Sequence, residues 1–158
     1  MMCKAIHPLI IVSSIFLRFG SKELEVVETP GHTSGCVTYI MREAAQAFTG
    51  DALLINGCGR TDFQEGCSKT LYNSVWTEIL SLPEHYQLYT AHDYNGLTVT
   101  TVGEEKKSNP RLTLSEEKFV QLMDELGLPY PKKIDISLPP NKLCGLQNLP
   151  EDMEEWVK

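Results

Sequence analysis

The stretch Phe48–Phe63, FTGDALLINGCGRTDF, constrains the fold and function of this chain more than any other segment. A strand-like apolar start leads into a Gly-Asp turn, and a glycine-containing loop follows before Arg60. A carboxylate in a tight turn at the end of a strand is a common position for a metal ligand. We therefore interpret Asp51 as a candidate metal ligand and Arg60 as a candidate anion-binding group.

Composition places the chain among ordinary globular proteins. Its 158 residues suffice for one domain with a core and are too few to favour two. The net charge of -7 comes from dispersed acidic residues, which argues against nucleic acid or an anionic membrane as partner. The apolar run 8–17 is too short to cross a bilayer. Five cysteines without a CxxC pair favour free thiols over a disulfide framework.

Hydrophobic periodicity predicts strands first, then helices interleaved with short strands. Alternating or β-branched segments predict strands at 23–29, 36–41, 47–50 and 87–91, with a β-prone segment at 98–102. Helical spacing and capping signals predict helices over 68–82, 103–108 and 115–126. The proline-rich segment from Pro129 onward predicts an extended course. This order predicts an α/β fold with a mixed sheet.

Polar side chains lie where three of the predicted strands end. They are His32 in TPGHTSG, Asp51 in FTGDAL, and His92-Asp93-Tyr94 in AHDY. Imidazole together with carboxylate favours zinc or non-haem iron over calcium or magnesium. His32, Asp51 and His92 form, in principle, a set of two histidines and one carboxylate. A single His or Asp in a turn is more often a hydrogen-bonded structural group, but three such signals together favour a metal site.

Two arginines and a tyrosine suggest an anionic substrate. Arg60, Tyr94 and Arg111 suit the carboxylates of a small anionic thiol compound. The alternative is that Arg60 pairs with Asp62 and that Arg111 caps a helix end. Residue type alone does not decide between them.

Four segments together resemble the persulfide dioxygenases of the metallo-β-lactamase superfamily, relatives of glyoxalase II. They are TPGHTSGCVTY, FTGDALLINGCGRTDFQEG, LYTAHDY and the EE–NPRLT run. The resemblance covers residues 17–147, and the GDALL–GCGRTDFQ run is its most specific part. It implies an α/β fold that comprises the C-terminal sheet and helices of an αββα sandwich.

The resemblance implies an iron(II) enzyme of sulfide catabolism that oxidises glutathione persulfide with dioxygen to sulfite and glutathione. It implies His32 and Asp51 as iron ligands. The glutathione contacts that it implies are Arg60, Tyr94 and Arg111. It also implies that His92 and Asp93 lie near the iron without binding it, which argues against His92 as the third ligand.

The family's remaining iron ligand is the first histidine of an HxHxDH motif upstream of TPGHT, whereas only His7 precedes His32 here. We therefore expect residues 1–16 to be a non-matching segment, 17–147 to be the C-terminal part of the domain, and 148–158 to be an acidic tail. The N-terminal half of the sandwich is expected to be missing. Iron would then be weakly held or absent, and activity would be impaired. An uncovered sheet face predicts exposed apolar surface and self-association into homo-oligomers.

Two other functions remain open. One is a hydroxyacylglutathione hydrolase like glyoxalase II, which uses two zinc ions and the same TPGHT, GDAL and GCGR segments. The other is a non-enzymatic glutathione-binding protein or a short form without function. By resemblance we expect the mitochondrial matrix as location, with the cytoplasm as the alternative.

Overall fold

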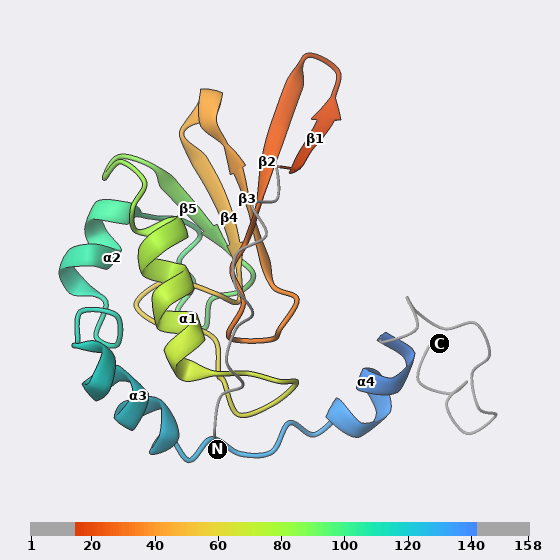
Figure 1. Ribbon diagram of the computed structural model, residues 1–158, viewed down its shortest axis with the longest axis vertical. Coiled ribbons are helices and arrows are strands. Elements are labelled where there is room, and N and C mark those ends of the chain that lie inside the picture. The colour runs from red at the N-terminus through yellow and green to blue at the C-terminus, as the bar shows by residue number, and fades with distance from the viewer. Residues whose placement is uncertain (1–14, 142–158) are drawn as a thin grey trace, which may run out of the picture. The chain divides into compact units, whose positions relative to one another are not determined.

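The computed structural model describes residues 15–141, and Figure 1 shows how their elements are arranged. The chain divides into two compact units, Met1–Leu126 and Gly127–Lys158. Nearly all of the expected non-matching segment 1–16, and the whole expected acidic tail 148–158, lie outside the described residues.

A mixed sheet is the centre of the first unit, as the sequence predicted, but it has six strands and includes a first strand at Ile15–Phe19 that the periodicity did not predict. Its spatial order follows the sequence, and every neighbouring pair is antiparallel except β4 and β5, which are parallel. The strands are β1 Ile15–Phe19, β2 Lys22–Glu28, β3 Val37–Met41, β4 Gln46–Gly50, β5 Gln87–Thr90 and β6 Thr100–Thr101.

The helices of this unit follow the predicted segments closely. They are η1 Arg42–Ala44, α1 Ser68–Ser74, η2 Val75–Ile79, α2 Val102–Ser108 and α3 Glu116–Asp124. The predicted helix 68–82 is present as α1 followed directly by η2, a single π-helical turn. A capping box starts α2, because the Thr101 side chain accepts from the Glu104 amide and the Glu104 side chain accepts from the Thr101 amide. This double cap explains why so short a charged segment is helical.

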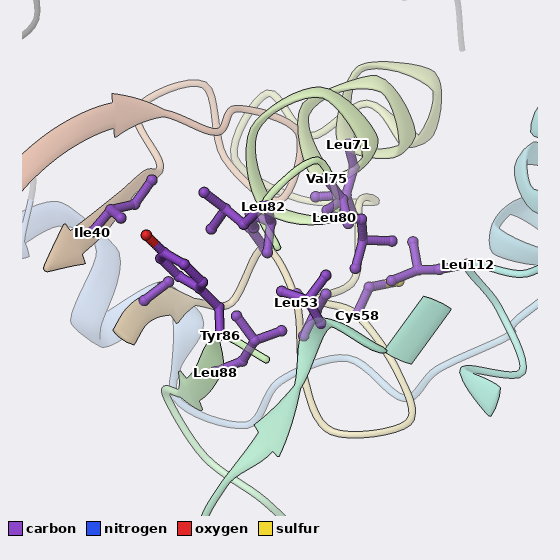
Figure 2. Packing of buried hydrophobic residues seen from close by; sticks show 14 of the residues in the cluster. Ile40, Leu53, Cys58, Leu71, Val75, Leu80, Leu82, Tyr86, Leu88 and Leu112 are labelled. Carbon is purple, nitrogen blue, oxygen red and sulfur yellow. The ribbon is translucent and has the colours of Figure 1, made fainter. Parts of the chain in front are cut away.

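The core lies on the sheet face that packs against the helices. Ile40, Ala47 and Leu88 are register partners on β3, β4 and β5, and all three are almost fully buried. They pack with Leu71 and Val75 of the α1–η2 segment in one hydrophobic cluster (Figure 2). Burial of this apolar face stabilises the fold and fixes the register, since a shift by one residue would expose it.

The opposite face carries an apolar row that crosses the sheet. Register partners place Ile15, Val26, Tyr39, Phe48 and Tyr89 side by side on five strands. Ile15 is 54% exposed and Phe48 is 36% exposed. The Phe48 and Tyr89 rings stack with their centroids 5.4 Å apart. We call these five residues the apolar row, and they bear out the expectation of exposed apolar surface.

The second unit contains α4, Ile134–Asn141. The predicted extended course from Pro129 onward is therefore wrong for these residues. Residues 132–138 contain no proline or glycine, so a turn can begin at Pro131, whose carbonyl accepts from the Ile134 amide at 3.2 Å. The helix then includes Pro139 and Pro140 near its end. Within residues 15–141, no helix is long and apolar enough to span a membrane.

The prediction of free thiols holds for part of the cysteine set. Cys36 and Cys58 are free, whereas Cys67 is disulfide-bonded. Disulfide formation depends on which thiols the fold brings within bonding geometry, and sequence spacing does not reveal this.

Candidate metal and anion site

Three strand ends meet at one edge of the sheet and bring the predicted metal residues together. Strands β2, β4 and β5 run in the same direction, because β3 is antiparallel to both β2 and β4, and β4 is parallel to β5. His32 follows β2, Asp51 follows β4 directly, and His92 follows β5. A register irregularity between Phe48 and Gly50 redirects the chain just before Asp51.

The two histidines face the same carboxylate. His32 Nε2 lies 3.9 Å from Asp51 Oδ2, and His92 Nδ1 lies 3.4 Å from Asp51 Oδ1. The Asp51 side chain is 31% exposed, so it is open to a ligand from solvent. The structure thus brings together all three members of the set that residue types suggested.

The orientation of His32 is set by the loop that follows Asp51. Its Nδ1 lies 2.6 Å from the carbonyl oxygen of Arg60. A carbonyl oxygen only accepts, so Nδ1 carries the proton and, in the neutral ring, the lone pair is on Nε2. This Nε2 is the nitrogen that faces Asp51, and a backbone carbonyl on the other ring nitrogen is typical of metal-binding histidines.

Gly59 permits the close approach of His32 and Asp51. Its amide donates to the Asp51 carbonyl oxygen at 2.8 Å. A Cβ at this position would overlap that carbonyl oxygen and would lie 2.9 Å from His32 Nδ1. The glycine loop therefore fits tightly between the two candidate ligands.

The donor set suits a metal ion but is small. Imidazole nitrogens and carboxylate oxygens are the ligands expected for iron or zinc. Among residues 15–141, no group of three or more His, Cys, Asp or Glu side chains is arranged to hold a metal. Catalytic sites commonly use three protein ligands. His32 and Asp51 therefore stay predicted ligands that form part of a coordination shell.

Arg60 is bound by a carboxylate of its own loop. Its Nε and Nη2 donate to Asp62 Oδ1 and Oδ2, each at 2.7 Å. The guanidinium group also lies over the Phe63 ring, 4.5 Å from the centroid. The hydrogen bond from Arg60 lowers the pKa of Asp62, which favours its charged form. The alternative interpretation of Arg60 as the partner of Asp62 is thus confirmed for this state of the protein.

Arg111 joins the same loop instead of capping a helix. Its Nη1 donates to the Cys58 carbonyl oxygen at 3.1 Å. Cys58 is two residues before Arg60 in the same loop. The Cys58 side chain is buried, and this burial raises the pKa of its thiol. Cys58 is thus a packing group, while Arg111 braces the loop.

Tyr94 and Asp93 lie on the loop after β5. Tyr94 is 84% exposed and meets the His92 ring edge-on, with centroids 5.1 Å apart. Asp93 Oδ2 accepts from the amides of Asn95 at 2.7 Å and Leu97 at 2.8 Å, and the Leu97 bond is the largest cause of its lowered pKa. Asp93 therefore shapes this loop, while Tyr94 is available to a ligand.

Sequence reasoning assigned no role to Glu105 and Asn109, although both lie in the EE–NPRLT run. Glu105 is 1% exposed and Asn109 is 0% exposed. Their spacing of four residues at the end of a charged helix was the available signal, because it places two polar side chains on one helix face.

Comparison with known proteins places these residues in a family. Residues 15–92 match the metallo-beta-lactamase superfamily. The chain is 58% identical over 134 residues to the mitochondrial persulfide dioxygenase ETHE1 of Mus musculus, covering 85% of this chain and 53% of that protein. It is 57% identical over 131 residues to the Homo sapiens protein, covering 83% and 52%. The crystal structure of ETHE1 from Myxococcus xanthus matches with a TM-score of 0.81 and 42% identity, covering 86% and 60%.

Residues 15–92 therefore form a metallo-beta-lactamase domain. The resemblance to persulfide dioxygenases is confirmed, and the chain spans about half the length of the curated relatives that it matches. The expected α/β fold is confirmed as well. A domain of this superfamily implies a metal, and the edge formed by His32, Asp51 and His92 has suitable donors.

Proposed function

We propose that this chain carries one part of a persulfide dioxygenase site, with His32 and Asp51 as ligands of one iron(II). The observation that supports it most is the pair of histidine nitrogens facing one carboxylate at the sheet edge, in a chain 58% identical to a persulfide dioxygenase. The reaction is the oxidation of glutathione persulfide by dioxygen to sulfite and glutathione. Bound iron(II) would supply the redox chemistry with dioxygen.

The residues of the chain itself would bind glutathione and orient the metal ligands. The Arg60 carbonyl holds His32 so that Nε2 faces Asp51, the other residue that would hold the iron. Arg60, Tyr94 and Arg111 are the proposed contacts of glutathione. Asp62 already occupies the Arg60 fork, so a glutathione carboxylate has to share or replace that bidentate pair. His92 and Asp93 support the site without binding the metal.

We expect this chain to hold iron weakly. Removal of a supporting partner commonly costs about tenfold or more in metal affinity, and loss of a ligand costs at least as much. After anaerobic loading with ferrous iron and desalting, iron should be well below one per chain, and oxygen uptake with glutathione persulfide should be slow. Asp51→Ala should remove the remaining iron. Stoichiometric iron with sustained turnover would contradict the proposed weakness of the site.

Assays of the same purified chain distinguish the proposed oxidation from hydrolysis. With ferrous iron in excess, the persulfide should support oxygen uptake, and S-lactoylglutathione should not be hydrolysed with zinc. Zinc-dependent hydrolysis without oxygen uptake would favour the glyoxalase II-like alternative. Calorimetry with glutathione tests the non-enzymatic alternative, since binding without either reaction would support it.

Location and assembly are also proposals. The mammalian relatives are named as mitochondrial proteins, and we propose the mitochondrial matrix for this chain. We further propose that the chain associates with itself, because the apolar row leaves large side chains in water.

Phe48→Lys should weaken this association, because it puts a charge within the apolar row. Sedimentation velocity over a range of concentrations should show the average mass fall toward that of the monomer. Gln121→Lys is the control, since it adds the same charge at an exposed position on α3. Equal association of both variants and the unmodified chain would show that the apolar row is not responsible.

A further inference from the structure

A buried carboxylate lies behind the glycine loop, outside the proposed ligand set. Glu105 on α2 is 1% exposed. It accepts from the Asn56 amide at 3.1 and 3.2 Å, from Thr100 Oγ1 at 2.8 Å and from Asn109 Nδ2 at 2.7 Å. Burying a carboxylate is costly unless such donors replace water. Glu105 therefore costs more free energy to bury than an apolar residue would at the same position.

Asn109 extends this contact to the next residue of the loop. Its Nδ2 also donates to the Gly57 carbonyl oxygen at 3.0 Å. Its Oδ1 accepts from the amides of Arg111 and Leu112, each at 3.0 Å. Both ends of the amide are thus fully used, so one buried side chain joins α2, the glycine loop and the segment that carries Arg111.

The loop continues from these anchors to the candidate metal ligand. Cys58 accepts from Arg111 at its carbonyl oxygen, and Gly59 donates to the Asp51 carbonyl oxygen. The Arg60 carbonyl then accepts from His32 Nδ1 at 2.6 Å. Asn56 and Gly57 are therefore fixed from behind, three or four residues before the carbonyl that orients His32.

We propose that Glu105 and Asn109 are positioning residues that fix segment 56–60, so that the Arg60 carbonyl holds His32 with its proton on Nδ1 and its lone pair on Nε2. A carbonyl held in place selects one histidine tautomer, whereas a displaced carbonyl does not. The inference rests on the proposed function only in taking His32 as a metal ligand. The tautomer itself is a property of the chain without metal.

Glu105→Gln tests this directly. The glutamine keeps the size of the side chain, but its NH2 group would face donors instead of accepting from them. Nitrogen-15 NMR of the His32 ring, recorded without metal at a pH where ordinary histidine is neutral, reports the tautomer. The unmodified chain should show mainly the Nδ1–H form, and Glu105→Gln should convert about half or more of it to the Nε2–H form. An unchanged tautomer in the folded variant would overturn the proposal, as would an Nε2–H form in the unmodified chain.

Thr100→Val is the matched control. It removes one donor from the same carboxylate but leaves both bonds from the Asn56 amide. It should lower the melting temperature and leave the His32 tautomer unchanged, whereas a purely structural network would give the same response in both variants. Should Glu105→Gln unfold the chain, Asn109→Ser provides the same test, because it removes the Asn109 bonds to Gly57 and Glu105 and keeps the bonds from Asn56 and Thr100 to Glu105.

Titration with Co²⁺ separates this inference from the proposed function. Because an orienting partner is lost, Glu105→Gln should bind Co²⁺ about tenfold more weakly than the unmodified chain. The Co²⁺ affinity of Thr100→Val should equal that of the unmodified chain. If the unmodified chain binds no Co²⁺ but shows the expected tautomer response, the positioning role stands and the proposed metal site fails. If it binds Co²⁺ and neither tautomer nor affinity responds to Glu105→Gln, the positioning role fails alone.

Discussion

Gly59→Ala should separate His32 from Asp51 and thereby lower the metal affinity that this edge of the sheet provides. The added Cβ would overlap the Asp51 carbonyl oxygen and would lie 2.9 Å from His32 Nδ1. Neither neighbour can yield freely, since the Asp51 carbonyl accepts from the Gly59 amide and His32 is held by Arg60. We expect a loss of about 1–3 kcal/mol in the free energy of unfolding from overpacking. Metal affinity should fall by about tenfold or more.

Gly57→Ala provides a matched control in the same loop. A Cβ at Gly57 would have Leu54 Cβ as its nearest neighbour, at 4.0 Å, which is ordinary contact. Its effect on stability should stay within about 1 kcal/mol, because an alanine in an allowed conformation also restricts the unfolded chain. Urea unfolding and Co²⁺ titration measure both quantities. Equal behaviour of the two variants would show that Gly59 has no special role in the site.

Gly31→Ala should be the more destabilising glycine replacement. Gly31 has φ +136°, which side chains with a Cβ rarely adopt, and the new Cβ would overlap the backbone of Leu71 in α1. The Gly31 carbonyl oxygen also accepts from the Cys67 amide at 2.8 Å, so the segment cannot move away from α1 without losing that bond. Backbone strain of about 1–3 kcal/mol adds to a similar overpacking cost. Since His32 is the next residue, its position should change as well.

The control for this variant is Gly35→Ala, in the same turn. Nothing lies within 4 Å of a Cβ at Gly35. Its free energy of unfolding should differ from that of the unmodified chain by about 0.5 kcal/mol or less. Thermal and urea unfolding are the measurements. The contact with Leu71 would lose its importance if both variants unfolded at the same urea concentration.

Much of the fold was predictable because local patterns agreed with the tertiary structure. The predicted strand 23–29 is β2 at Lys22–Glu28, and the predicted helix 103–108 is α2 at Val102–Ser108. Alternating apolar residues fit a sheet with one buried face, and a capping box starts a helix locally. The second unit was predicted less well, because α4 includes Pro139 and Pro140, so proline content alone did not indicate an extended course there.

The site residues were predictable as types, but not their partners. Polar residues beside glycine at strand ends indicated His32, Asp51 and His92, and parallel strand directions brought them to one edge. Arg60 forms an ion pair with Asp62, which was one of the two alternatives that residue type left open. The roles of Glu105 and Asn109 were missed, because their four-residue spacing indicates only a shared helix face and not the hydrogen-bond partners about fifty positions away.

The sequence by itself determined the elements, the family resemblance and the candidate ligands around Phe48–Phe63, because periodicity, capping and motif chemistry are local properties. The tertiary structure alone decided which groups face one another. In the structure, the Arg60 carbonyl orients His32, and Gly59 lies between His32 and Asp51. The buried side chains of Glu105 and Asn109 hold segment 56–60 by hydrogen bonds. These contacts depend on the distance of segment 56–60 from the sheet edge on one side and from α2 on the other. The packing of the core sets both distances.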